Sequence, residues 1–240
     1  FCGPMRSIAA RHGPEAGGWK ITGSAILSAL ALLTLVGFFT QYAQPIGDNT
    51  EFSVLSRHEP QTGGSLYLVR SDGARETRLL TFSDKDIWGS AVSPKGKRIA
   101  FRVASGKNPE SDIYVARADG SDARRLTHSG RHDTQPAWSP DGKQIAFISI
   151  PAGTSGEYLL QTVRMDGSGL MTLAAGVAEK RFPAWSPDGR FIAYETRNGF
   201  NQQLAIVSKS GGEPRWLDST SGGDEPAWSR DLSLIHISEP

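Results

Sequence analysis

A seven-residue phrase that recurs at a regular interval constrains the fold of this chain more than any other feature. The phrase Pro-Ala-Trp-Ser-Pro-Asp-Gly occupies residues 136–142 and returns at residues 183–189. Weaker copies lie at residues 90–96 and 226–231, and the serines of successive copies are 46, 47 and 43 residues apart. A fixed period of this length indicates a repeat architecture, in which each repeat forms one small structural unit.

Each complete repeat is predicted to contain four short β-strands. No stretch after residue 50 shows helical periodicity, whereas strand-like runs separated by Gly, Pro and Asp recur throughout. The complete repeats give strands at 90–93, 98–103, 112–117 and 124–127, at 136–139, 144–149, 158–165 and 170–174, and at 183–186, 191–196, 203–208 and 215–218. An incomplete unit precedes them and a single strand follows, at 51–57, 65–70, 77–81 and at 225–229.

The Ser-Pro-Asp-Gly part of the phrase predicts a hairpin turn. Proline presets the backbone at the second turn position, and Asp141 and Asp188 suit the third position. Gly142 and Gly189 accept the left-handed conformation that closes such a turn. We therefore expect these four residues to have structural roles in building the repeat.

The second strand of each complete repeat is apolar at three adjacent positions, for example Ile145, Ala146 and Phe147. A strand with one face in water would alternate, so these strands should be covered on both faces. Four-stranded sheets stacked every ~45 residues form the blades of a β-propeller. We therefore predict an all-β fold, a partial β-propeller of four-stranded antiparallel blades. The innermost strands carry tryptophans that we expect to pack between blades rather than to stack on a ligand: Trp138, Trp185 and Trp228.

These motifs resemble the repeats of the TolB-type, WD-repeat-like β-propeller family. The resemblance rests on Trp-Ser-Pro-Asp-Gly-Lys/Arg-x-Ile-Ala-Phe/Tyr at 138–147 and 185–194, on residues 112–120 and on Arg-Leu-Thr at 125–127, and it covers residues 51–231. In TolB itself an α/β domain precedes the propeller, and the short segment before residue 51 leaves no place for it. Propellers of this family close with about six or more blades, so we expect the ring to be incomplete at the C-terminal end.

An uncharged and mostly apolar segment precedes the repeats at residues 21–43. About 20 apolar residues in a helix span a bilayer core, so we predict one transmembrane α-helix that acts as a signal anchor. The basic segment 1–20 is then cytoplasmic under the positive-inside rule, and residues 44–50 form a linker. The predicted location is the inner (cytoplasmic) membrane, single-pass, with the propeller in the periplasm or the extracellular space. A signal peptide cleaved after Ala43 is the alternative.

The repeat phrase breaks after Asp231, where the expected glycine and the next strand are replaced. Residues 232–240 resemble the translation of a sequencing adapter. We therefore expect the propeller to span residues 51–231 and residues 232–240 to be a non-native tail.

The composition and the motifs give no indication of catalysis, of a cofactor or of a metal site. The net charge of +1 offers no bulk attraction to nucleic acid, and the single cysteine allows no intrachain disulfide. No Gly-x-Ser-x-Gly motif and no phosphate-binding glycine loop occurs in the sequence. His128 and His132 have zinc-ligand spacing only for a helix, and they lie between predicted strands. We predict no catalytic, cofactor-binding or metal-binding residue.

The loops that enter the inner strands carry charged residues and should open on one end of the propeller. The acids are Asp84, Asp86, Asp133, Glu179, Asp224 and Glu225, and the bases are Lys85, Arg131, Lys180 and Arg181. A polar rim of this kind is suited to contact a peptide or a protein, and the alternative is simple solvation of the loops. The candidate contact residues are Asp86, Arg131, Asp133, Arg181 and Asp224.

A rigid scaffold with charged loops and no catalytic set favours a non-catalytic binding module. The sequence therefore predicts a membrane-anchored, exported propeller that binds a protein, a peptide or a glycan, and no nucleic acid. Two alternatives remain open. One is the extracytoplasmic sensor domain of a membrane-bound regulator with a DNA-binding or kinase domain upstream. The other is the propeller of a prolyl-oligopeptidase-like serine peptidase whose hydrolase domain lies downstream.

Overall fold

The computed structural model describes residues 41–46, 49–59, 63–70, 75–105, 110–152, 156–199, 201–217, 226–229 and 235–237. All of these residues belong to one structural unit, residues 37–240. Every regular element among them is a β-strand, so none is a helix long and apolar enough to cross a membrane. The predicted cytoplasmic segment 1–20 and residues 21–40 of the predicted transmembrane helix lie outside the described residues.

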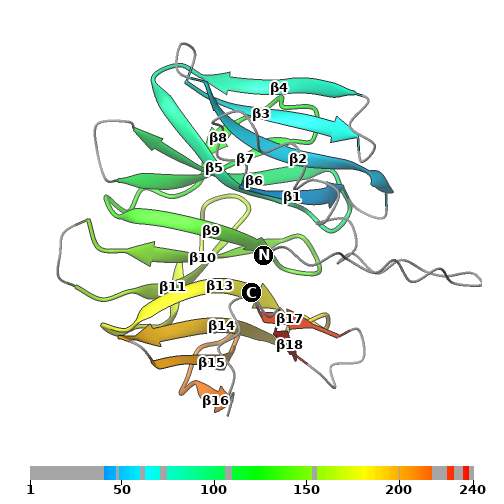
Figure 1. Cartoon of the computed structure of the whole chain (residues 1–240). Coiled ribbons are helices and arrows are strands. Elements are labelled where there is room, and N and C mark those ends of the chain that lie inside the picture. The colour runs from blue at the N-terminus through cyan, green and yellow to red at the C-terminus, as the bar shows by residue number, and fades with distance from the viewer. Residues whose placement is uncertain are drawn as a thin grey trace, which may run out of the picture. The chain divides into compact units, whose positions relative to one another are not determined.

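The strands form consecutive antiparallel sheets, which we call blades 1 to 5 (Figure 1). Blade 1 contains β1 (Gln41–Ile46), β2 (Asn49–Glu59), β3 (Gly63–Arg70) and β4 (Glu76–Phe82). Blade 2 contains β5 (Lys85–Val92), β6 (Arg98–Ser105), β7 (Ser111–Arg117) and β8 (Arg124–Arg125). Blade 3 contains β9 (His132–Trp138), β10 (Gln144–Ile150), β11 (Leu159–Arg164) and β12 (Met171–Ala174). Blade 4 contains β13 (Glu179–Trp185), β14 (Phe191–Asn198), β15 (Asn201–Ser208) and β16 (Arg215–Leu217). Blade 5 contains β17 (Pro226–Trp228) and β18 (Ile235–Ile237).

The first strands of successive blades pack against one another, so we call them the inner strands. Within each blade the strands pair in chain order, from the inner strand outward. A single parallel pairing of Ser111 with His132 also joins β7 to β9, which links blades 2 and 3 into one sheet. The all-β, propeller-like architecture predicted from the repeat is confirmed in the described part of the chain.

Two expectations about the ends of the repeat region are wrong. The first unit has four strands, because β1 pairs with β2 across register shifts, where the sequence indicated three. β1 occupies residues 41–46, and β2 begins at Asn49. These residues were expected to form the end of the membrane span and the linker. In the last unit, β18 pairs with β17 through Trp228 and Ile235, so a second strand follows within the predicted tail. β1 and β18 are short and have no turn motif beside them. They are recognised as strands only because they pair with β2 and β17.

The core lies between successive blades, as the apolar second strands predict. Ile145, Ala146 and Phe147 of β10 are fully buried, with side chains that alternate between the two faces of blade 3. Ile145 and Phe147 pack against blade 2, whereas Ala146 packs against Trp185 and Tyr194 of blade 4. Burial on both faces confirms that these sheets stack as blades.

Each blade has two ends, which the connections define. The Ser-Pro-x-Gly turns and the turns between third and fourth strands lie at one end, which we call the turn end. The connections into the inner strands and those between second and third strands lie at the other end, which we call the rim. The turn ends of successive blades lie within van der Waals distance of each other. A Cβ atom built on Gly142 of blade 3 would lie 3.9 Å from Pro94 Cδ of blade 2. The same addition at Gly189 would lie 3.6 Å from Pro140 Cδ.

Candidate functional site

A repeated hydrogen bond ties each inner strand to the preceding blade. The indole Nε1 of every repeat tryptophan donates to the backbone oxygen of the alanine one blade earlier: Trp138 to Ala91 (2.9 Å), Trp185 to Ala137 (3.2 Å) and Trp228 to Ala184 (3.0 Å). Trp138 and Trp185 are also buried. The structure places these rings in the seams between blades, where their hydrogen-bond donor is already used.

The Ser-Pro-Asp-Gly turn of blade 3 is closed by side-chain hydrogen bonds. Ser139 Oγ donates to Asp141 Oδ1 over 2.7 Å, and the amide of Lys143 donates to the same oxygen over 3.0 Å. Gly142 has the left-handed φ of 69° that the turn requires. The hydrogen bond from Ser139 is the main cause of the lowered pKa of Asp141.

The turn of blade 4 repeats this geometry. Ser186 Oγ donates to Asp188 Oδ1 over 2.7 Å, the amide of Arg190 donates to the same oxygen over 3.0 Å, and Gly189 has a φ of 67°. The bond from Ser186, followed by those from Arg190, lowers the pKa of Asp188 to about 2. Both aspartates therefore hold turns at the end of the blades that lies opposite the rim.

The inner strands share a left-handed bulge that the sequence pattern does not reveal. Gly89, Gln135 and Phe182 occupy equivalent positions, four residues before the turn serine, with φ values of 52°, 53° and 50°. The pairing register of each inner strand shifts at this point. Gln135 Oε1 accepts a hydrogen bond of 3.0 Å from the backbone amide of Phe182, which joins the bulges of blades 3 and 4. The proline that follows Gln135 and Phe182 is the one sequence signal for a break in strand geometry.

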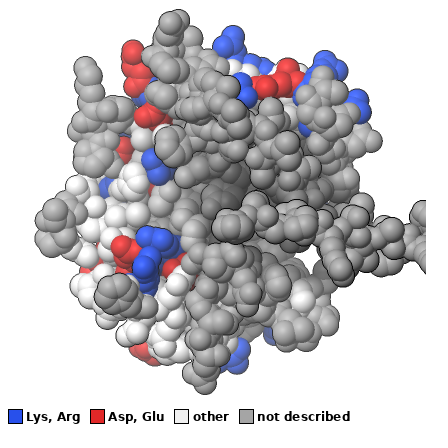
Figure 2. All heavy atoms as spheres, viewed as in Figure 1, with Lys and Arg blue, Asp and Glu red and all other residues white. Residues whose placement is uncertain are grey.

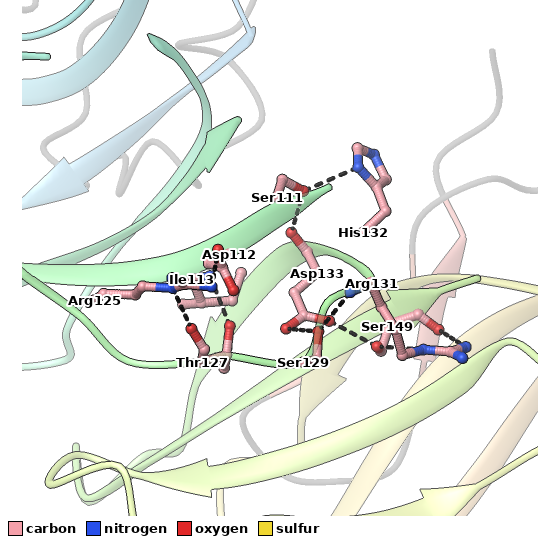
Figure 3. Close-up of polar contacts among 10 residues, drawn as sticks. All are labelled: Ser111, Asp112, Ile113, Arg125, Thr127, Ser129, Arg131, His132, Asp133 and Ser149. Atoms are coloured by element: carbon pink, nitrogen blue, oxygen red, sulfur yellow. Dashed lines mark hydrogen bonds and ion pairs between the residues drawn. The ribbon is translucent and has the colours of Figure 1, made fainter. Parts of the chain in front are cut away.

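The rim of blade 3 contains a buried polar network around Asp133 (Figure 3). Ser129 Oγ donates to Asp133 Oδ2 over 2.8 Å, and Ser149 Oγ donates to Asp133 Oδ1 over 2.6 Å. Arg131 reaches the same site, because its Nε donates to Ser149 Oγ over 3.0 Å and its Nη2 contacts the backbone oxygen of Glu157. Asp133 is fully buried, and its carboxylate holds the rim connection in place through these hydrogen bonds.

Ser111 and His132 lie side by side at this rim and connect two blades. Ser111 Oγ donates to the backbone oxygen of Asp133 over 2.9 Å and lies 2.9 Å from His132 Nδ1. Together with the backbone pairing of the same two residues, this contact links β7 to β9.

Asp112 and Arg125 form an ion pair of 2.8 Å in blade 2 next to this network. Burial is the largest influence on Asp112 and raises the pKa of its carboxyl, and the hydrogen bond from Arg125 opposes that shift. Thr127 completes the connection, since its Oγ1 accepts from the amide of Ile113 over 3.0 Å. These contacts fix the course of the chain between β8 and β9.

The rim of blade 4 presents an apolar residue on a connection that a buried lysine holds. The ammonium of Lys180 lies 3.4 Å from the backbone oxygen of Gly176 and 3.3 Å from that of Ala178. Lys180 is only 5% exposed, and burial lowers the pKa of its amine. Between the two carbonyl groups lies Val177, whose side chain is 79% exposed. This connection between β12 and β13 therefore displays a valine to solvent.

The remaining predicted rim residues differ in their accessibility. Arg181 forms an ion pair of 2.8 Å with Glu179, and both side chains are about 40% exposed, at 42% and 38%. Asp86 lies on β5 near Arg102, whose guanidinium is 5.9 Å from the ring centre of Trp88. Burial is the main cause of the lowered pKa of Arg102, and the charge of Asp86 opposes it. The predicted contact Asp224 and the neighbouring loop residue Glu225 lie outside the described residues.

The exposed Val177 thus lies on the connection between β12 and β13, and Glu179 and Arg181 follow it at the start of β13. On the left-hand side of Figure 2, which is the rim side, basic and acidic side chains lie next to one another. In the described part of the chain, no group of three or more His, Cys, Asp or Glu side chains is placed to hold a metal ion. The exposed part of this connection therefore consists of one apolar residue beside one ion pair.

A family model described as "TolB beta propeller domain" matches residues 87–238. Among curated proteins, the Tol-Pal system protein TolB of Anaeromyxobacter dehalogenans is 35% identical over 100 residues, which cover 37% of this chain and 23% of that protein. Dipeptidyl-peptidase 5 of Porphyromonas endodontalis is 29% identical over 68 residues, which cover 27% of this chain and 10% of the peptidase. The chain therefore spans less than a quarter of the length of these relatives.

Solved structures share the fold at lower identity. TolB from Acinetobacter baumannii superimposes with a TM-score of 0.61 at 19% identity, over 75% of this chain and 44% of that one. A structure described as one of two prolyl endopeptidases superimposes with a TM-score of 0.57 at 17% identity, over 85% of this chain and 33% of that one. At these identities the superpositions show that the β-sheet architecture is shared.

Proposed function

The chain belongs to the family of TolB-type β-propeller domains, and on that basis we propose that it is a non-catalytic module that binds a protein or peptide through its rim. A rigid stack of sheets that carries irregular connections at one end is suited to binding. The fold by itself does not define the ligand, so the argument depends on the rim. The name of the curated relative, a Tol-Pal system protein, supports a protein as the partner rather than a glycan.

The exposed side chain of Val177 carries this proposal. A few residues near the centre of a protein interface contribute most of the binding free energy, and arginine is among the types enriched there. Val177 is 79% exposed, and the buried ammonium of Lys180 holds the carbonyl groups on both sides of it. A connection fixed in this way loses little conformational entropy when a partner binds. Arg181 and Glu179 provide the adjoining charged contacts.

A peptide library displayed on phage and selected on the chain tests this function. Selected peptides should bind the chain in fluorescence anisotropy, and Val177→Asp and Arg181→Ala should each weaken binding about tenfold or more. Leu170→Asp provides the matched control, because Leu170 is 56% exposed but lies at the turn end of blade 3. Peptides that bind the Val177→Asp and Leu170→Asp variants equally well would contradict the assignment to the rim.

We further propose that the module is exported and held at the inner membrane by the uncharged segment that begins at residue 21 and ends before β1. The uncharged length of that segment and the basic residues before it support this orientation. A periplasmic reporter enzyme fused after Asp48 should be active, whereas a cytoplasmic reporter at the same site should be inactive. Activity of the cytoplasmic reporter would contradict the proposed orientation.

A second candidate is the propeller domain of a prolyl-oligopeptidase-like serine peptidase. Two observations favour it, namely the similarity to dipeptidyl-peptidase 5 and the shared fold with a prolyl endopeptidase. The reading frame of the gene on both sides of these residues distinguishes the two. A downstream Gly-x-Ser-x-Gly motif with a later histidine would favour the peptidase, and a stop codon soon after the last blade would favour the binding module.

A further inference from the structure

We propose that the turn end of blade 2 is a binding surface for a short acidic segment of a polypeptide. The surface consists of Lys95, Lys97, Arg98 and Arg117, and we call it the blade 2 basic surface. It lies at the opposite end of the blades from Val177 and Arg181. The proposal is therefore independent of the function proposed for the rim.

Lys95 departs from the turn chemistry of the other blades. Asp141 and Asp188 hold this position in blades 3 and 4, and each accepts hydrogen bonds from the turn serine and from a backbone amide. A lysine has no acceptor, so the blade 2 turn lacks both bonds. The turn itself is kept, since the amide of Arg98 still donates to Ser93 Oγ over 3.0 Å. Departures from a locally consistent sequence tend to mark functional positions.

The turn end of blade 2 also carries a larger excess of positive charge than the turn ends of blades 3 and 4. Its two turns, residues 93–98 and 117–124, contain five basic and two acidic residues. The corresponding turns of blade 3 contain two of each, and those of blade 4 contain three basic and two acidic residues. Lys95, Lys97 and Arg117 are exposed.

In the described part of blade 3, the position next to Lys95 carries no charge. In blade 3, Lys209 of the next blade lies close enough to lower the pKa of Asp141. Met165 of blade 3 is equivalent to Lys209 of blade 4. The amide of Met165 donates to the backbone oxygen of Lys143, and the amide of Lys209 donates in the same way to that of Arg190. Lys95 therefore has Met165 beside it, where Asp141 has Lys209. Within the described residues, Lys95 forms no ion pair. The charge is therefore available to a partner.

The small extent of the surface favours an acidic peptide segment over a membrane or a nucleic acid. A bilayer or an extended polyanion would contact several blades, and the turn end of blade 3 has as many acidic as basic residues. A run of a few carboxylates matches the size and charge of this surface.

Lys95→Asp introduces the residue that blades 3 and 4 have at this position, and it separates an effect on binding from an effect on folding. The probe is a fluorescein-labelled octaglutamate peptide, titrated with the full 240-residue chain at low salt. Lys95→Asp should raise the Kd about tenfold or more, because it reverses one of the four charges of the surface. The same variant should raise the melting temperature by about 2–4 °C, because it restores the two turn hydrogen bonds. A loss of binding therefore cannot result from a failure to fold.

Lys143→Asp is the matched control, since Lys143 is an exposed turn residue of blade 3 outside the surface. It should change the Kd less than about twofold. Equal weakening by Lys143→Asp and Lys95→Asp would overturn the proposal, and so would unchanged binding by Lys95→Asp. Sedimentation of both proteins with vesicles of phosphatidylglycerol and phosphatidylcholine tests the lipid alternative. Vesicle binding that depends on Lys95, without octaglutamate binding, would assign the surface to lipid and overturn the acidic peptide.

Discussion

Each repeat tryptophan contributes a buried ring and a hydrogen-bond donor to the seam between two blades. The ring of Trp185 packs with Ala146 and Ile148 of blade 3, and its Nε1 donates to the backbone oxygen of Ala137. A buried acceptor that loses its donor costs free energy, because water cannot replace the bond. The tryptophan therefore sets both the distance and the register of neighbouring blades.

Trp185→Phe should lower the free energy of unfolding by about 1 kcal/mol, because phenylalanine retains most of the ring and removes the donor. Urea unfolding followed by circular dichroism measures the change. Trp216→Phe is the control, because Trp216 is 54% exposed on β16, and it should leave the midpoint almost unchanged. Equal effects of the two variants would show that the hydrogen bond from Trp185 to Ala137 does not contribute measurably to stability.

The turn carboxylates predict how stability responds to acid. The pKa of Asp188 is lowered to about 2 in the folded chain, whereas an unfolded aspartate titrates near pH ~3.9. The stabilisation is therefore complete above pH ~4 and is lost as the pH falls towards about 2. The melting temperature of Asp188→Asn should fall less steeply than that of the parent across this interval. The control Glu213→Gln removes one exposed carboxylate of the same blade, and a slope matching that of Asp188→Asn would contradict the prediction.

At the scale of the strands, the inner-strand bulge is strained in blades 3 and 4. A residue other than glycine with a left-handed φ costs about 1–2 kcal/mol, and Gln135 and Phe182 both have one. Blade 2 has Gly89 at this position, which avoids the cost. The hydrogen bond from the amide of Phe182 to Gln135 compensates in part. Such strain persists only where the surrounding sheet over-determines the backbone.

Two substitutions of Gln135 separate the strain from the hydrogen bond. Gln135→Ala and Gln135→Gly both remove the bond to Phe182, and only the glycine variant also relieves the strain. Gln135→Gly should therefore be more stable than Gln135→Ala by about 1 kcal/mol in urea unfolding. The opposite order, as found at ordinary strand positions, would show that the bulge is not retained.

Strand prediction succeeded where turn chemistry and burial acted together. Every predicted strand of the complete repeats matches an observed one, and β10 at Gln144–Ile150 differs from its predicted range by one residue. The strands β1 and β18 were missed, because Pro45 and the short Ile-His-Ile segment carry no periodic signal of their own. Pairing with a partner strand defines such elements, and a partner is not visible in a local pattern.

At the scale of the whole molecule, the seams between blades provide most of the hydrophobic core. Phe147 is fully buried between blades 2 and 3, whereas Phe191 at the turn end of blade 4 is 36% exposed. Phe147→Ala should lower the free energy of unfolding by about 3–5 kcal/mol, and Phe191→Ala should cost far less. Guanidinium unfolding of the two variants checks this, and similar losses would place the core elsewhere.

The sequence by itself determined the repeat, the blade, the family and the structural role of the Ser-Pro-Asp-Gly turns, because these features depend on local turn geometry and on burial at adjacent positions. The tertiary structure decided which charged residues are buried and which are exposed. Asp133 and Lys180 occupy equivalent inner-strand positions near the rim, and both are buried with local hydrogen bonds. Val177 has no motif, yet it is the exposed apolar residue there. Charge in a sequence shows that a residue must be solvated or paired, and only the fold determines which of the two occurs.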